Sequence, residues 1–226
     1  MDQHAAAVTF SKLAHELHST EGLEETLELL VEAAPALVGS GSAGVLLTRR
    51  GRLAEPGPGT EPVAEKADRL QLEFEAGPAW DAVGEMHTVH APAVAAYPEV
   101  RWGEAVAALG IGSALSVRLW TSEVTLGAIT FYAERPRWFD ENAIATAEIV
   151  GRHASIALAS ARNEESLHQA IDGRKLVGQA QGILMERFDL DDRRAFDVLR
   201  RYSQANNVKL IEVARLLVST RELPED

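Results

Sequence analysis

The stretch Ser113–Tyr132, SALSVRLWTSEVTLGAITFY, decides the fold of the N-terminal part of the chain. Its two ends, Ser113–Leu119 and Leu126–Tyr132, are rich in the β-branched, aromatic and other apolar residues that favour buried strands. The polar residues Thr121–Glu123 separate these ends over a length typical of a hairpin turn. The pattern therefore predicts two adjacent antiparallel strands.

Strand and helix patterns alternate on the N-terminal side of this hairpin. We expect a buried strand at Ala43–Thr48 and, after a turn, a short strand at Leu53–Ala54. We expect a loop at Glu55–Gly59, because its two prolines and two glycines disfavour regular structure. The other expected elements are two short helices or one kinked helix in Gln3–Val38, helices at Lys66–Glu75, Ala79–Val83 and Val100–Leu109, and a short strand at Thr88–His90. Such a mixture of strands and helices is typical of an α+β sheet domain.

The chain changes character after Asp140, whose carboxylate suits the N-cap of a helix. From Ala143 to Leu184 apolar residues recur at helical spacing without proline, which predicts one long helix or two nearly collinear ones. A helix of this length needs a partner for its apolar face, so we expect a homodimer. Two shorter helices are expected around Ala195–Tyr202 and Leu210–Val218.

These patterns divide the chain into an α+β domain, residues 1–165, and an all-helical tail, residues 166–226, and the two parts differ in charge. Residues 1–165 hold 12 basic and 24 acidic residues, and residues 166–226 hold 10 of each, so the whole net charge of −12 belongs to the first domain. Because nucleic-acid binding depends on Lys and Arg, this asymmetry indicates domains with different partners.

The composition excludes several classes of site. Without cysteine, the sequence has no disulfide, thiolate nucleophile or cysteine zinc site. We find no phosphate-binding glycine loop, paired catalytic carboxylates or Ser-His-Asp set, and we expect neither an enzyme nor a cofactor. His87 and His90 would point to opposite faces of a strand, which argues against a shared metal. No apolar run is long enough for a membrane helix and no secretory signal is visible, so we expect a cytoplasmic protein.

The tail carries the most specific motif of the chain. Val177–Arg187 (VGQAQGILMER), Leu199–Gln204 (LRRYSQ) and Lys209–Val218 together resemble the ANTAR domain, over most of Leu167–Pro224. The resemblance implies a three-helix module that binds RNA and acts in transcription antitermination. The candidate RNA-binding residues are Arg174, Lys175, Gln179, Gln181, Arg187, Arg200, Arg201, Gln204 and Lys209. The family usually has Lys where this chain has Gln181.

The side chains themselves support the same interpretation, with an alternative. Arg and Gln supply forked donors for phosphates and unpaired base edges, as RNA loop recognition requires. The alternative is an ordinary solvated helix face. Gly178 and Gly182 destabilise a helix interior by about 1 kcal/mol each relative to Ala, so we expect another backbone, a packed helix in preference to RNA, to approach them closely.

The N-terminal domain resembles the GAF domain from about Gly22 to Ala161. The resemblance is carried by Ala43–Leu47, Gly77–Val83, Ser113–Val117, Leu126–Tyr132 and Trp138–Asp140. It implies a sensor of a small molecule or a partner, but the cyclic-nucleotide signature is not present in full, and the ligand stays open. The four tryptophans, Trp80, Trp102, Trp120 and Trp138, could line a sensor pocket, although large apolar side chains more often belong to the core.

The sequence thus predicts a dimeric RNA-binding regulator of transcription antitermination. A GAF-like sensor domain would control an ANTAR-like tail that binds structured RNA at hairpin loops and stabilises an antiterminator stem-loop. One alternative is a small-molecule sensor whose helical tail only dimerises or docks a partner protein. Another is a DNA-binding regulator, against which stands the neutral charge of the tail.

Overall fold

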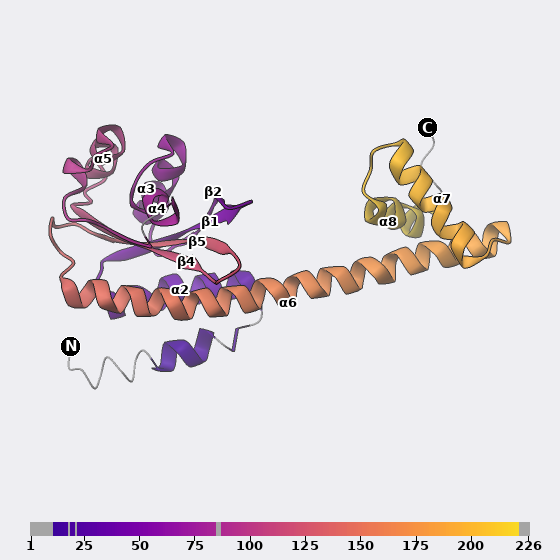
Figure 1. Cartoon of the computed structure of the whole chain (residues 1–226), viewed down its shortest axis with the longest axis horizontal. Helices are drawn as coiled ribbons and strands as arrows, with labels where there is room; N and C mark the ends of the chain where they lie inside the picture. The colour runs from indigo at the N-terminus through magenta and orange to yellow at the C-terminus, as the bar shows by residue number, and fades with distance from the viewer. Residues whose placement is uncertain (1–10, 18, 21, 85–86, 222–226) are drawn as a thin grey trace. The chain divides into compact units, whose positions relative to one another are not determined.

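The computed structural model describes residues 11–17, 19–20, 22–84 and 87–221. It forms two compact units, Met1–Asn163 and Glu164–Asp226, which we call the N-terminal unit and the tail unit. The boundary between them falls inside helix α6 (Glu141–Phe188), shown in Figure 1. Each unit has a hydrophobic core of its own.

An antiparallel sheet of five strands forms the centre of the N-terminal unit in the described part of the chain, and the α+β class is confirmed. The spatial order is β2-β1-β5-β4-β3, with β1 at Ser42–Arg49, β2 at Arg52–Gly59, β3 at Thr88–Ala91, β4 at Ser113–Trp120 and β5 at Thr125–Ala133. The expected hairpin is strands β4 and β5, in which Ser116 lies opposite Thr130. β5 is buried almost throughout because it lies in the middle of the sheet.

The prediction of a loop at Glu55–Gly59 is wrong. These residues continue β2, which pairs with β1 as far as Gly59 opposite Gly44. β2 is an edge strand, so Pro56 and Pro58 need no ladder partner on its open side. The pairing of β1 with β2 is irregular, with register shifts between Gly44 and Leu46 and between Leu47 and Thr48.

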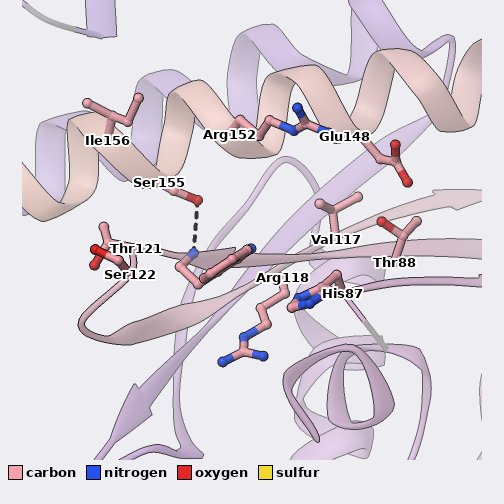
Figure 2. Close-up of a pocket in the computed structure, with 11 residues that line it drawn as sticks. His87, Thr88, Val117, Arg118, Thr121, Ser122, Glu148, Arg152, Ser155 and Ile156 are labelled. Atoms are coloured by element: carbon pink, nitrogen blue, oxygen red, sulfur yellow. Dashed lines mark hydrogen bonds between the residues drawn. The ribbon is translucent and has the colours of Figure 1, made fainter. Parts of the chain in front are cut away.

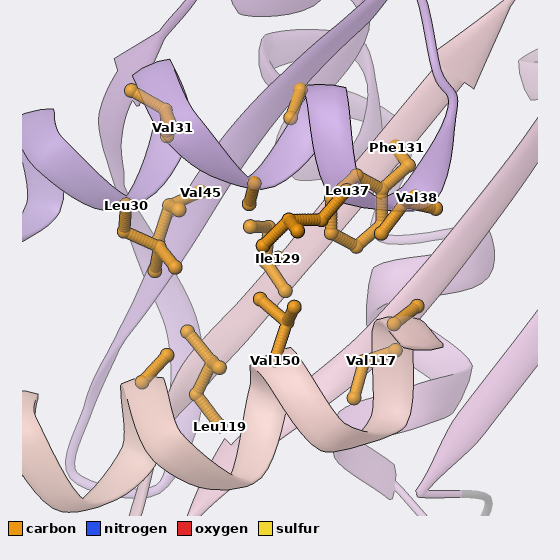
Figure 3. Close-up of a cluster of buried hydrophobic side chains, with 14 of the residues drawn as sticks. Leu30, Val31, Leu37, Val38, Val45, Val117, Leu119, Ile129, Phe131 and Val150 are labelled. Atoms are coloured by element: carbon orange, nitrogen blue, oxygen red, sulfur yellow. The ribbon is translucent and has the colours of Figure 1, made fainter. Parts of the chain in front are cut away.

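Helices cover both faces of the sheet. On one face α2 (Leu23–Val38) and the first half of α6 pack against inward-facing residues of β1, β4 and β5, such as Val45, Leu119 and Ile129 (Figure 3). On the other face lie α3 (Pro62–Phe74), α4 (Pro78–Gly84) and α5 (Val100–Ala107) (Figure 1). Of the predicted Gln3–Val38 region, residues 11–17 are helical and α2 follows, so two helices form; residues 3–10 lie outside the described residues.

Helix α6 begins where the sequence predicted, because the Asp140 carboxylate accepts a hydrogen bond from Ala143 N at 2.8 Å. In the N-terminal unit, α6 buries Ala147, Val150, Ala154 and Leu158. All residues from 162 to 172 are exposed. No side chain of this segment is therefore part of either hydrophobic core.

The tail unit is built from the last part of α6 with α7 (Asp192–Ala205) and α8 (Leu210–Thr220). Asp191 caps α7 by accepting a hydrogen bond from Arg194 N at 2.8 Å. The buried core contains Ala180, Leu184, Ala195, Leu199, Val213, Ala214 and Leu217. The described helices include none with the length and apolar character that crossing a bilayer requires.

Candidate functional site

The tail core decides which side chains of α6 face outward. Ala180 and Leu184 are buried, so the helical period of 3.6 residues places the neighbouring polar residues on two flanks. Arg174 and Gln181 lie on the flank toward α7 and α8, whereas Lys175 and Gln179 lie on the other, exposed flank. The structure thus separates the α6 candidates into two surfaces.

The remaining candidates lie at three places in the tail unit. Arg200, Arg201 and Gln204 are exposed on α7, where the Arg200 guanidinium contacts the Asp197 carboxylate at 2.7 Å. Lys209 is exposed at the N-cap of α8, which has no side-chain cap hydrogen bond. Arg187 Nη1 donates to the Arg221 carbonyl at 2.5 Å, so part of its donor capacity is used inside the unit.

An open groove of about 620 Å³ lies between α6, α7 and α8. Its lining consists of Gln169, Ala170, Gly173, Arg174, Val177, Gln181, Phe196, Leu210 and Ile211. Phe196 and Ile211 were not among the sequence candidates, because apolar residues at helical spacing are expected in the core. In the structure both are only partly buried and neither belongs to the tail core cluster.

Gln181 is fixed in place by α7. Its Nε2 atom donates to Asp192 Oδ1 at 2.8 Å and to the Asp192 carbonyl at 3.2 Å. The amide nitrogen is therefore occupied, and the amide oxygen remains available as an acceptor beside the groove.

The expectation that a packed helix approaches Gly178 and Gly182 is wrong for the described chain. Both glycines are exposed, and a Cβ atom added to either would meet no heavy atom within 4 Å. Packing within this chain thus does not offset the free energy by which these glycines destabilise the helix relative to alanine.

The interior of the N-terminal unit holds a buried polar network. Asp68 Oδ1 accepts hydrogen bonds from the Tyr132 hydroxyl at 2.5 Å and from Gln71 Nε2 at 3.3 Å. Gln71 Oε1 in turn accepts from Ala79 N at the start of α4, at 2.8 Å. The three side chains link α3, α4 and β5, and Asp68 packs so closely on Gly44 that a Cβ there would overlap with the carboxylate.

Burial shifts the titration of this network. Desolvation raises the pKa of Asp68 from 3.8 to about 7, against the opposing hydrogen bonds from Tyr132 and Gln71. Desolvation, followed by the charge of Asp68, raises the pKa of Tyr132 well above its ordinary value. The network therefore holds a carboxyl group that titrates near neutral pH.

A second pocket, of about 670 Å³, opens at the edge of the sheet between strands β3 and β4 and helix α6 (Figure 2). Ser155 of α6 accepts a hydrogen bond from Trp120 N at 2.9 Å, and the Trp120 ring stacks on His87 at a centroid distance of 4.9 Å. Figure 2 shows Val117 and Thr88 directed toward α6 and Arg118 directed away from it. The polar side chains that line this pocket do not converge on one point.

Of the four tryptophans, two pack in the core, one lines a pocket and one is exposed without lining a described pocket. Trp102 is fully buried in the core on the α5 side of the sheet, and Trp80 is partly buried against Leu46 and Ala79. Trp120 lines the pocket of Figure 2, and Trp138 is 46% exposed. Among the described residues no group of three or more His, Asp or Glu side chains is placed to hold a metal ion.

Comparison with protein families finds two matches. A GAF domain model matches residues 20–159, and an ANTAR domain model matches residues 165–218. No curated protein matches the chain.

Solved structures show the same fold for the N-terminal unit. The GAF domain of a phosphoenolpyruvate-protein phosphotransferase from Coxiella burnetii is 16% identical, with a TM-score of 0.59, 74% of this chain and 99% of that chain covered. A free methionine-R-sulfoxide reductase from Neisseria meningitidis is 16% identical, with a TM-score of 0.53 and 71% and 93% covered. The photosensory core module of a Stigmatella aurantiaca phytochrome is 13% identical, with a TM-score of 0.57 and 89% and 45% covered. At these identities the likeness concerns the fold alone.

Proposed function

Because the chain belongs to the GAF domain family and continues into an ANTAR domain, we propose that it is an RNA-binding regulator of transcription antitermination. In this proposal the ANTAR domain binds a structured leader RNA and stabilises an antiterminator stem-loop. The GAF domain receives a small-molecule signal and controls that binding. The proposal includes no catalytic step and places the protein in the cytoplasm, where transcripts form.

The observation that carries the proposal is the surface of the tail unit. Arg200, Arg201 and Gln204 are exposed on α7, and Arg174 lines a groove that also contains an aromatic ring, Phe196. Guanidinium groups bind phosphates, and aromatic rings stack on unpaired bases. This combination suits an RNA loop better than duplex DNA, whose affinity depends more on net positive charge.

A dimer would present two such surfaces to two RNA loops. The exposed apolar residues Ile149, Ile156 and Leu167 of α6 follow one another at intervals of seven and eleven residues, which keep them on one side of a helix. Ile171, one turn beyond Leu167, is 60% exposed. We propose that this stripe pairs with the same stripe of a second copy, so that RNA binding gains avidity.

The proposal is tested by filter binding with the full-length protein. The probes are RNA hairpins with a constant stem and a randomised loop, the same stem without a loop, and duplex DNA. We expect hairpins to bind most tightly and the pair of substitutions Arg200→Gln and Arg201→Gln to weaken hairpin binding about tenfold or more. The control is Arg215→Gln, which removes the same kind of charge from an exposed position of α8.

Two outcomes would contradict the proposal. Equal binding to hairpins and duplex DNA would favour a DNA-binding regulator. Absence of any nucleic-acid binding would favour a sensor whose tail only dimerises or docks a partner protein.

A further inference from the structure

We propose that the groove between α6, α7 and α8 binds one unpaired base of the RNA loop. This inference rests on the proposed RNA-binding function and assigns the part of the surface that reads the loop. The groove has a volume of about 620 Å³, which lies within the usual range of small-ligand pockets, so the groove accommodates a single base.

The apolar side of the groove provides a stacking surface. Phe196 is a partly exposed aromatic residue outside the tail core cluster, so the fold does not need its full burial. Ile211 of α8 lines the same groove, and a Cβ added at Gly173 of α6 would be 3.1 Å from Ile211 Cδ1. α6 and α8 therefore meet closely at the groove, and the apolar surface exists before any ligand binds. Stacking on an aromatic ring is open to every base.

The polar side of the groove provides selectivity. Asp192 holds the Gln181 amide through its nitrogen, which leaves Oε1 as a fixed acceptor. An acceptor favours a base with an N–H group at that edge, such as the exocyclic amine of adenine or cytosine or N1–H of guanine. Uracil also has an N–H on its Watson–Crick edge, but this N3–H lies between two carbonyl oxygens that would repel the Gln181 oxygen, so we expect uracil to be the poorest occupant.

Charge around the groove favours nucleic acid over a partner helix. Arg174 lines the groove and forms no ion pair within the described residues, and Lys209 precedes the groove residue Leu210. Asp192 also lies near and keeps its negative charge although the Gln181 amide donates to it, so the two cations Arg174 and Lys209 outnumber this anion. Free cations beside an aromatic surface match a base with its phosphate, whereas an apolar helix would leave Arg174 without a partner.

The test is a coupling experiment with the full-length protein. A hairpin is first selected from the pool with the randomised loop, and each loop nucleotide is then replaced by an abasic one. For the wild type we expect one position at which loss of the base weakens binding about tenfold or more. The Phe196→Leu variant should bind the intact hairpin more weakly than the wild type does. Its affinity should not change further when the base at that position is removed.

Phe188→Leu is the matched control, because Phe188 is 55% exposed at the end of α6 and does not line the groove. It should bind like the wild type, and circular dichroism should show both variants folded. If the wild type binds no RNA, the proposed function itself fails. If RNA binds but Phe196→Leu keeps the full sensitivity to base loss at every position, the groove does not hold a base. A change of oligomeric state in Phe196→Leu without such coupling would make the groove a protein interface and also overturn the proposal.

Discussion

Asp68 connects the stability of the N-terminal unit to pH. Its pKa is about 7 in the folded chain, against an ordinary value of 3.8, because burial disfavours the charged carboxylate. The folded state therefore holds this proton more tightly than the unfolded state. Asp68 contributes most to stability below pH 4, and that contribution is lost as pH rises through about 7.

We expect the free energy of unfolding to fall between about pH 4 and pH 7 because of this group, by up to about 1.4 kcal/mol per pH unit. Asp68→Asn should flatten this dependence, since a neutral amide keeps an acceptor for the Tyr132 hydroxyl. Urea unfolding at several pH values measures the effect. Glu73→Gln, at an exposed position of the same helix, serves as the control. If the variant keeps the pH dependence of the wild type, that dependence does not come from Asp68.

Gln181 gives a second prediction at the scale of one residue. Lys at this position, as the family usually has, would lie beside the Asp192 carboxylate that now accepts from the amide. The new charge would then pair within the tail unit, and the salt dependence of RNA binding should change little. Gln181→Lys combined with Asp192→Asn should steepen the slope of log affinity against log salt by about 0.7 for each phosphate that the lysine neutralises. A steeper slope in Gln181→Lys alone would show that Asp192 does not neutralise the lysine.

The sequence could not reveal these two sites in full. The Gln181–Asp192 contact depends on how the chain turns between α6 and α7, and the Asp68–Tyr132 bond joins residues 64 positions apart. Arg174 and Gln181 can be predicted as candidates from the sequence, because their side chains supply the hydrogen-bond donors that RNA recognition requires. Phe196 was missed because its spacing fits a core residue equally well, and only the packed unit shows that the core excludes it.

At the scale of elements, regular patterns were the most reliable guide. The β4–β5 hairpin and the long helix α6 follow from periodicity and agree with the structure. The sequence predicts too short a β2, because prolines and glycines disfavour a central strand but are tolerated in an edge strand such as this one. Pairing partners such as β1 with β5 are non-local, so no local pattern could predict the strand order.

Helix α6 also carries the prediction on assembly. Ile156 is 55% and Leu167 is 65% exposed, so Asp at both positions should leave the fold of one chain intact. A carboxylate buried in a helix pair is costly, and the double variant should sediment as a monomer with weaker RNA binding. His168→Asp, next to Leu167 but farther round the helix, adds a charge outside the stripe and should remain dimeric. A monomeric wild type at micromolar concentration would refute the pairing.

The whole molecule combines an acidic GAF domain with a neutral ANTAR domain. All of the net charge of −12 belongs to residues 1–165. Like charges repel within about a Debye length, which is roughly 30 Å at 0.01 M salt and shrinks to a few Å toward 1 M. The sensor domain should therefore weaken RNA binding at low salt, whatever its ligand.

Removing part of this charge tests the effect in the full-length protein. Glu24, Glu28 and Glu32 form an exposed stripe on α2, and changing all three to Gln reduces the magnitude of the net negative charge, from −12 to −9. Gln has nearly the helix propensity of Glu, so the melting temperature should change little. We expect tighter hairpin binding than the wild type at about 0.01 M salt and no difference at about 0.5 M, where screening is strong. If the two proteins bind equally at low salt, the field of the sensor domain does not reach the RNA, and control by the sensor must then act through α6 or the dimer.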